Sequence, residues 1–562
     1  MTATELNFSP NRLYYGDCLN VLRGWPAECV DLVYLDPPFN SKANYNILYG
    51  GGNGVPAQVR AFTDTWHWDE AAAARMVAAE RATARRSHRI LTGLRAVLGD
   101  TGMLAYLTYM AERLEECRRV MRSHASLYLH CDPTASHYLK LLCDSVFGPG
   151  NFRNEIIWKR SSAHSDTKQG AKSPGRIHDT LLFYTNSERW TWNPQYTDYD
   201  DEYIKRAYRH VEEGTGRRYR FDNLTAAKPG GDTSYEWRVK RPKGGEWSGD
   251  LDDEWRTPLE GWEYKGIPPY KGRYWAYSVE NIREYERQGR LCYARTGMPN
   301  YKRYVDEMPG VVLQDIWTDI QPVITSPERL GYPTQKPLAL LARIIETSSN
   351  PGDIVLDPFC GCGTTVAAAE LARRQWVGID ISPFAVKLVR DRRLRPMGRD
   401  AEIAGIPTDM EGAQMLLDRS PLDFEAWAVT SIPGLAPNER RIGDRGIDGR
   451  GAMMHLPDGE SSRLVVAQVK GGGYTASSMR DFQRVIEREK AAAGVYITLR
   501  KTAARGARQA ATEMGTIEIG ARQYPKLQLW SVEELLEGEL PRLPDMADPY
   551  TGKRVRQAEL FE

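Results

Sequence analysis

Four residues, Asp36-Pro37-Pro38-Phe39, follow the apolar run Val30–Leu35 and suit one particular reaction. The exocyclic amine of a nucleobase is a poor nucleophile because its lone pair is conjugated into the ring. A carboxylate (Asp36) and the carbonyl of a proline-stiffened turn (Pro37) can each accept an N–H bond and free that lone pair. Phe39 can stack on a base that has left the duplex, and the prolines remove backbone donors that would compete for Asp36. The plainer interpretation is a turn that ends a strand.

A glycine-rich segment late in the chain, Asp353–Thr365, reads as a strand, a turn and the start of a helix. Gly361 and Gly363 let the backbone pass close to a ligand. We expect Thr364 and Thr365 to cap the helix that follows.

The next apolar run, Gln375–Ile379, predicts a second strand and ends in Asp380. An acidic residue in that position commonly holds ribose hydroxyls. A glycine loop, helix, strand and terminal carboxylate in this order predict a site for a nucleoside cofactor.

Together these motifs resemble the beta class of S-adenosylmethionine-dependent amino DNA methyltransferases, in which the catalytic motif precedes the cofactor motif. Asp36–Phe39 matches the catalytic motif and Asp357–Thr365 the methionine-binding loop. Thr334–Pro337 matches the element that leads into that loop, and Gly16–Leu19 an acidic loop near the adenine. The resemblance covers residues 1–395. It implies cofactor-binding roles for Asp17, Lys336, Asp357, Phe359, Gly361, Gly363, Thr364 and Asp380.

The resemblance also indicates a target. A first-position Asp36 with Phe39 in fourth place is more typical of adenine-N6 enzymes than of cytosine-N4 enzymes, which usually begin with Ser. Two segments, Phe152–Trp158 and His178–Tyr184, match sequences beside the target-base pocket. The histidines His130, His137 and His178 are more typical of core or hydrogen-bonding positions than of catalysis, because methyl transfer needs no histidine.

The composition is globular, and 562 residues predict several domains. The net charge of +1 does not indicate nucleic acid, so binding of double-stranded DNA would have to come from local basic stretches, each of which can equally be a solvated surface. The eight cysteines show no metal-ligand spacing, and we find no signal peptide or membrane-length apolar run, so we expect a reduced, cytoplasmic protein. The basic stretches are Lys159–Arg160, Lys168–Arg176, Arg217–Arg220, Arg238–Lys243 and Lys387–Arg399.

The fold class expected is α/β: a Rossmann-like methyltransferase sheet with an inserted target-recognition region, plus a C-terminal α/β restriction-endonuclease-like domain. Apolar periodicity predicts a helix over Met103–Ser123 and then a strand over Leu127–His130. The aromatics near Trp237 and Trp275 suit either base stacking or a small core of their own. The expected boundaries are 1–185 (catalytic half), 186–330 (target recognition), 331–395 (cofactor half), 396–420 (linker), 421–540 (nuclease-like domain) and 541–562 (tail).

The C-terminal region carries a second candidate site. Asp448 precedes a strand with the spacing Gln468-x-Lys470, and Glu425 lies on an expected helix. Glu425, Asp448 and the Gln468 oxygen could hold Mg²⁺, and Lys470 could orient water or stabilise phosphorane charge. This pattern, over residues 421–540, resembles the Mrr-like branch of PD-(D/E)xK endonucleases. The alternative is a DNA-binding module that has kept the fold and lost cleavage.

The sequence therefore predicts a DNA adenine-N6 methyltransferase joined to a Mg²⁺-dependent nuclease-like domain in restriction–modification or phage defence. Action as a homodimer or with a separate restriction or defence subunit remains open. One alternative is a cytosine-N4 methyltransferase with a non-cleaving C-terminal domain. The other is a non-catalytic DNA-binding protein that uses the cofactor as a ligand, against which the intact Asp36–Phe39 motif argues.

Overall fold

A computed structural model describes most of the chain, which forms two compact units, Met1–Asn193 with Gln314–Glu562, and Pro194–Leu313. Each unit is treated by itself. In the described part of the chain, no helix is both long and apolar enough to cross a membrane. The described residues are 7–38, 44–48, 58–63, 66–161, 174–230, 233–252, 259–323, 328–330, 332, 334–438, 446–459, 462–501, 505–549 and 554–555.

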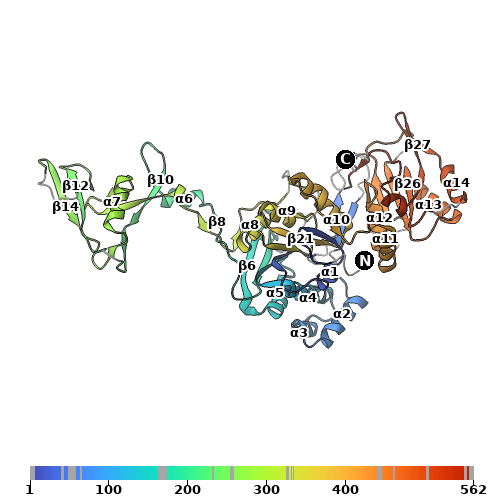
Figure 1. The fold of residues 1–562 in the computed structure, drawn as a ribbon, viewed down its shortest axis with the longest axis horizontal. Coiled ribbons are helices and arrows are strands. Elements are labelled where there is room, and N and C mark those ends of the chain that lie inside the picture. Colours follow the sequence, from blue (N-terminus) through green and yellow to red (C-terminus); the bar gives the residue numbers. More distant parts are fainter. Residues whose placement is uncertain are drawn as a thin grey trace. The chain divides into compact units, whose positions relative to one another are not determined.

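The larger unit is built on a sheet in which the described chain places nine strands, in the order β19-β6-β7-β5-β2-β20-β21-β1-β22 (Figure 1). The neighbours from β5 to β22 pair in parallel, whereas β7 runs antiparallel to both β5 and β6. The strands are β1 (Arg12–Tyr15), β2 (Val30–Leu35), β5 (Met121–Cys131), β6 (Phe152–Lys159), β7 (His178–Thr185), β19 (Ile316–Trp317), β20 (Ile354–Asp357), β21 (Gln375–Asp380) and β22 (Ile403–Ala404).

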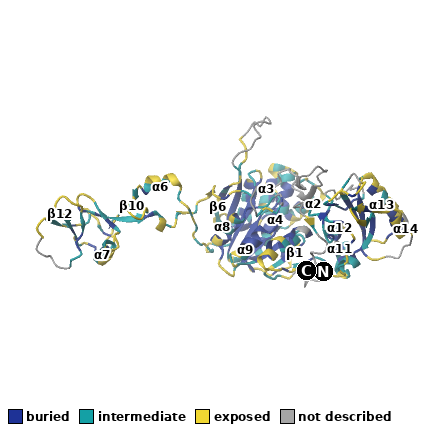
Figure 2. Cartoon of the chain, turned by 90° about the horizontal axis from the view of Figure 1, so that it is seen from above, coloured by how far each residue is buried: buried dark blue, intermediate teal, exposed yellow. Residues whose placement is uncertain are grey.

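The central strands are apolar and buried, as expected for a parallel sheet with helices on both faces. Every residue of β2 is buried, and Figure 2 shows the same for the middle of the sheet. The cost of burying the Asp31 carboxylate within β2 is offset by hydrogen bonds. It accepts one from Arg122 at 2.7 Å and one from the Ile354 amide at 2.8 Å. The helices are α1 (Cys18–Arg23), α2 (Glu70–Arg81), α3 (His88–Leu98), α4 (Gly102–Val120), α5 (Ser136–Phe147), α8 (Leu338–Ser348), α9 (Thr364–Leu371) and α10 (Pro383–Leu388).

Strand β2 pairs with β20, and Val33 lies opposite Leu356, although more than 300 residues separate them in sequence. The parallel strands β2, β20, β21 and β1 end at one edge of the sheet, where ligands of such folds bind. One expected boundary was wrong. The helix predicted over Met103–Ser123 ends at Val120, because the chain turns extended at Met121 and enters β5.

The smaller unit, Pro194–Leu313, lies inside the range expected for target recognition. Trp237 and Trp275 are buried with Leu224, Val239 and Ile282 in a core of its own, so at these positions the aromatics pack rather than stack on a ligand. Its described elements include β9 (His210–Val211), β10 (Arg218–Asn223), β12 (Trp237–Pro242), β13 (Ser248–Gly249), β14 (Trp262–Ile267), β16 (Leu291–Tyr293), β17 (Pro299–Tyr304), α6 (Asp201–Ala207) and α7 (Val279–Arg287).

The C-terminal region contains a second sheet, in the order β23-β24-β25-β26-β29, with helices packed against it. The range 396–420, expected to be a linker, instead holds β22 of the main sheet and helix α11 (Met410–Arg419), and the described start of the expected tail pairs with this region through Met453 and Met546. The elements are α12 (Pro421–Thr430), β23 (Leu435–Pro437), β24 (Gly449–Ala452), β25 (Leu464–Lys470), α13 (Ala476–Arg488), β26 (Ala493–Thr498), α14 (Arg505–Glu513), β29 (Leu527–Ser531) and β30 (Met546–Ala547).

Candidate active site

The carboxylate of Asp36, directly after β2, lies against the ammonium group of Lys336, two residues before α8. Nζ of Lys336 donates to both oxygens of Asp36, at 2.7 and 2.6 Å. Only 10% of the Lys336 side chain and 16% of the Asp36 side chain are exposed. Lys336, expected beside the cofactor, therefore contacts the predicted catalytic carboxylate in this structure.

The glycine loop between β20 and α9 has the backbone that its sequence predicts. Gly361 has φ +49° and Gly363 has φ +72°, both in the left-handed region that favours glycine. A Cβ atom on Gly361 would lie 3.2 Å from the ring of Tyr332. The loop is thus shaped by positions that a larger residue would strain.

Two carboxylates hold this loop, the buried Asp357 and the half-buried Asp380. Asp380, at the end of β21, accepts the N–H groups of Gly361 and Ser382, each at 2.8 Å. Asp357 accepts the Thr365 hydroxyl at 2.5 Å and the Phe359 N–H at 3.1 Å. Burial raises the pKa of Asp357 to about 7 and that of Asp380 to about 6. Charge on either group is therefore costly in the ligand-free fold.

The predicted capping of α9 by threonine was wrong. Gly363 is the N-cap residue, in left-handed conformation and without a side chain to cap with. The Thr365 hydroxyl bonds Asp357 instead, and Thr364 Oγ1 lies 3.4 Å from the buried Arg393 guanidinium, which also contacts the Cys362 carbonyl. Arg393, which sequence reasoning missed, comes from a turn of π-helix, Val389–Leu394.

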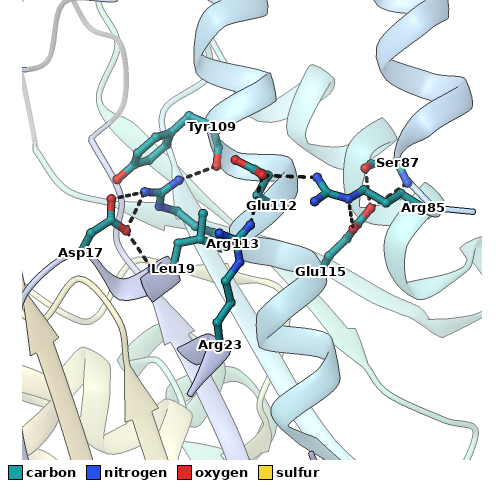
Figure 3. A network of polar contacts seen from close by, with 9 residues as sticks. All are labelled: Asp17, Leu19, Arg23, Arg85, Ser87, Tyr109, Glu112, Arg113 and Glu115. Carbon is teal, nitrogen blue, oxygen red and sulfur yellow. Dashed lines mark hydrogen bonds and ion pairs between the residues drawn. The ribbon is translucent and has the colours of Figure 1, made fainter. Parts of the chain in front are cut away.

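Asp17 lies in the loop after β1 and is held from two directions (Figure 3). Its side chain caps α1 by accepting the Leu19 N–H at 2.8 Å, and it accepts two bonds from Arg113 at 2.7 and 2.6 Å. Arg113 is 3% exposed, and its guanidinium lies 3.3 Å above the centre of the Tyr109 ring. Sequence reasoning missed Arg113; the signal was a charged residue inside the apolar face of the predicted helix.

These groups line one pocket at the carboxyl edge of the sheet, with about 850 Å³ of unfilled space including its open mouth. The size is that of a small-molecule site. Pro37 is buried and Pro38 lines the pocket, whereas Phe39 lies outside the described residues. The predicted residues that line the pocket are Asp17, Asp36, Pro38, Lys336, Asp357, Phe359, Gly361, Thr364 and Asp380.

Behind the pocket, a buried chain of hydrogen bonds crosses three neighbouring strands. The Tyr34 hydroxyl lies 2.9 Å from Nδ1 of His130, and Nε2 of His130 lies 3.2 Å from Asp179. His130 is fully buried, which confirms a hydrogen-bonding position for this histidine. Tyr34 was not predicted to be a site residue, although it stands two positions before Asp36.

Several described arginines of the basic stretches are engaged within the protein, whereas residues 168–173 of the stretch Lys168–Arg176 lie outside the described residues. Arg217 pairs with Asp306 and Glu307, and Arg241 pairs with Glu263. The stretch Lys387–Arg399 behaves likewise, since its arginines pair with Asp391, Asp548, Asp400 and Glu370 or bind the glycine loop. Sequence alone gives no sign of these partners, so for these stretches a plain structural role is sufficient.

The C-terminal candidate residues are partly brought together. Asp448 precedes β24, donates its N–H to Ala467 of β25, and accepts the Val469 N–H on its carboxylate at 2.7 Å. It therefore lies beside the strand that carries the buried Gln468 and the exposed Lys470. Glu425 lies on α12, which packs against β25. Within the described ranges no group of three or more His, Cys, Asp or Glu side chains is placed to hold a metal. The predicted set differs from such a group because its third member is the amide Gln468.

A family model described as DNA methylase, of N6 and N4 type, matches residues 30–391, which include both motifs of the pocket. The chain belongs to this DNA methylase family. It is 30% identical over 293 residues (51% of this chain, 57% of the relative) to the type II methyltransferase M.EcaI of Enterobacter cloacae. It is 23% identical over 380 residues (65% and 51%) to the StyLTI Mod subunit, a type III restriction-modification enzyme of Salmonella typhimurium. It is also 23% identical over 385 residues (68% and 83%) to the DNA adenine methyltransferase YhdJ of Escherichia coli.

The chain thus spans only a little over half the length of the first two relatives. Among solved structures, the cytosine-N4-specific PvuII DNA methyltransferase is 11% identical, with a TM-score of 0.33 over 68% of this chain and 86% of that one. The M1.HpyAVI–SAM complex is 12% identical, with a TM-score of 0.31 over 68% and 98%. Both likenesses are distant.

Proposed function

We propose that this DNA methylase transfers a methyl group from S-adenosylmethionine to the N6 amine of adenine in double-stranded DNA. The observation that carries the proposal is the joint placement of Asp36 and the glycine loop on one pocket. Residues far apart in sequence supply the two halves, as a reaction between a cofactor and a base requires.

The pocket fits the chemistry of that cofactor. Four carboxylates line it (Asp17, Asp36, Asp357 and Asp380), which suits a ligand that carries a positive sulfonium. The N-terminus of α9 behind Gly363 suits the cofactor's carboxylate. Asp380 and Asp17 keep free lone pairs beside the bonds they already accept, and these could hold ribose hydroxyls. The bound cofactor would supply an electrophilic methyl group.

In this proposal, Asp36 and the Pro37 carbonyl accept the two N–H bonds of the target amine. That geometry draws the nitrogen toward a tetrahedral form and aims its lone pair at the electrophile. The ammonium of Lys336 engages both oxygens of Asp36, and a carboxylate oxygen that accepts one bond can accept a second from the amine. Phe39 and Pro38 would close on the base faces.

Adenine is preferred over cytosine because Asp36 heads the motif and because a relative covered over 83% of its length is described as a DNA adenine methyltransferase. The test is to methylate DNA with labelled cofactor, digest it to nucleosides and identify the product by mass spectrometry. N6-methyl-2′-deoxyadenosine supports the proposal. N4-methyl-2′-deoxycytidine would favour the alternative, and unmodified DNA would contradict both.

We propose further that the C-terminal region, residues 421–540, cleaves DNA with Mg²⁺. The donor set of Glu425, Asp448 and Gln468 consists of oxygen atoms, which Mg²⁺ prefers, and the ion would polarise the phosphate and lower the pKa of a bound water. Lys470 would stabilise charge on the scissile phosphate. Since one such site cuts one strand, a double-strand break requires a second copy or a separate restriction subunit.

A further inference from the structure

A hydrogen-bonded chain of Tyr34, His130 and Asp179 begins at the pocket that Asp36 lines. Tyr34 lines the pocket together with Asp36. It lies on β2, His130 on the neighbouring β5, and Asp179 on the next strand, β7. The hydrogen-bonded chain extends to Arg160, because Oδ1 of Asp179 lies 3.0 Å from Nε of Arg160. The Arg160 side chain is 42% exposed. The hydrogen-bonded chain therefore runs from the pocket toward the surface.

The hydrogen positions follow from the chemistry of the partners. Burial alone would raise the pKa of Asp179, but hydrogen bonding to His130 and the positive charges of Lys336 and Arg160 bring that pKa below its usual value. An ionised Asp179 only accepts, so Nε2 of His130 carries a proton and donates. In a neutral ring, Nδ1 is then an acceptor, and the Tyr34 hydroxyl donates to it at 2.9 Å. The phenolic oxygen keeps its lone pairs.

Tyr34, His130 and Asp179 are thus linked in the same order as the hydroxyl, imidazole and carboxylate of a catalytic triad. In such triads the histidine takes a proton and the carboxylate stabilises the resulting cation. Burial, with the nearby charges of Asp36, Asp357 and Asp179, raises the pKa of Tyr34 well above its usual value, so the phenol stays protonated at rest. A hydroxyl of this kind can take up one proton only as it passes its own on.

We propose that Tyr34, His130 and Asp179 form a relay that removes the proton from the newly methylated amine. The inference rests on the proposed amine methylation. After the nitrogen gains a carbon it carries one proton too many. As the nitrogen becomes tetrahedral, one N–H turns from its first acceptor to the Tyr34 oxygen. That N–H bond breaks, its electrons stay on nitrogen, and the proton bonds to the Tyr34 oxygen while the Tyr34 proton moves to Nδ1 of His130. Nothing is oxidised or reduced, and the His130 cation rests beside ionised Asp179.

The ion pair between Lys336 and Asp36 explains why a group other than Asp36 would take the proton. Both oxygens of Asp36 are engaged by the Lys336 ammonium, so the carboxylate nearest the amine is poorly placed to take a proton as well. The groups that set the charge around His130 are Tyr34 on β2, Asp179 on β7, Arg160 after β6, Lys336 before α8, and Asp36 and Asp357 across Tyr34.

The first test needs no turnover. In protein labelled with ¹⁵N-histidine, with His130→Gln used to assign the signal, the relay requires Nδ1 unprotonated and Nε2 protonated at neutral pH. A proton on Nδ1 would overturn it. This readout is independent of the proposed function, which fails separately if the wild type transfers no methyl group.

The second test is the single-turnover rate of Tyr34→Phe, which keeps the ring and removes the hydroxyl. We expect a loss of at least tenfold, with cofactor and DNA affinity within twofold of wild type. The matched control is Tyr128→Phe, on the neighbouring strand, which removes an equally buried hydroxyl bonded to Ser348 at 2.8 Å. Equal rates for Tyr34→Phe and wild type would overturn the relay.

Discussion

Lys336 and Asp36 form a two-oxygen ion pair at 2.7 and 2.6 Å between segments 300 residues apart. The pair joins the segment after β2, which carries the proposed amine-activating motif, to the segment that leads into α8. The ammonium compensates a carboxylate that shares its pocket with three others. We infer that Lys336 holds the Asp36 carboxylate in place for the target base.

Replacing Lys336 by Met removes the charge and keeps most of the stem. A mostly buried Asp36 carboxylate is then left without its lysine partner, so methyl transfer should fall at least tenfold, and Lys336→Arg should recover part of it. The measurement is methyl incorporation into DNA at saturating cofactor. Lys140→Met is the matched control, because it removes an equally short lysine–aspartate pair, at 2.7 Å on α5. Equal losses in both variants would show that the effect is not particular to the pocket.

Protonation of Asp357 should stabilise the ligand-free fold. Its pKa is about 7 in the folded protein and near 3.8 in the unfolded chain, so the folded state takes up a proton first as the pH falls. Between pH 8 and 6 the free energy of unfolding of wild type should rise by about 1.4 kcal/mol relative to Asp357→Asn, which does not titrate. Denaturant unfolding at the two pH values measures this difference. A difference that stays constant would show that Asp357 does not titrate in this range.

Gly361→Val should weaken cofactor binding at least tenfold. The new Cβ would meet the Tyr332 ring at 3.2 Å, in a left-handed conformation that valine rarely adopts. Calorimetry with S-adenosylmethionine measures the effect, and circular dichroism checks the fold. Gly93→Val on α3, where a Cβ meets open space, is the control. Wild-type affinity in a folded Gly361→Val protein would contradict the assigned loop.

Asp448 and Lys470 should be needed for Mg²⁺-dependent strand cleavage and dispensable for methylation. The assay is plasmid nicking with Mg²⁺ or Mn²⁺ on unmodified and fully modified DNA, comparing wild type with Asp448→Ala and Lys470→Ala. Arg484→Ala, on the exposed surface of α13, serves as a control. Nicking by the Asp448 variant at the wild-type rate would place the metal elsewhere, and no nicking by wild type would favour a DNA-binding domain without cleavage.

Local features of the fold followed from sequence, whereas pairings between distant residues did not. β2, β20 and β21 could be predicted because each is a short apolar run that ends in a carboxylate, and the two glycines were read correctly from their place between strand and helix. The end of α4 was missed because Met121–Ser123 continue the apolar spacing while the sheet draws them into β5.

The contacts between residues of the site could not be predicted from the sequence. Arg113 with Asp17, Lys336 with Asp36 and His130 with Tyr34 are 96, 300 and 96 residues apart, so only the folded sheet decides that they meet. The same holds for Arg217 and Arg241, whose acidic partners are 89 and 22 residues away. A run of positive charge in sequence therefore says little about which charges face a ligand.

The most direct test of the account is Asp36→Ala, assayed for methyl incorporation and cofactor affinity in the same preparation. The carboxylate accepts the amine N–H in this account, and the glycine loop holds the cofactor without it. We predict that incorporation of labelled methyl into adenine falls below detection while S-adenosylmethionine affinity by calorimetry stays within a few-fold of wild type. Incorporation at the wild-type rate in the folded Asp36→Ala protein would contradict the account.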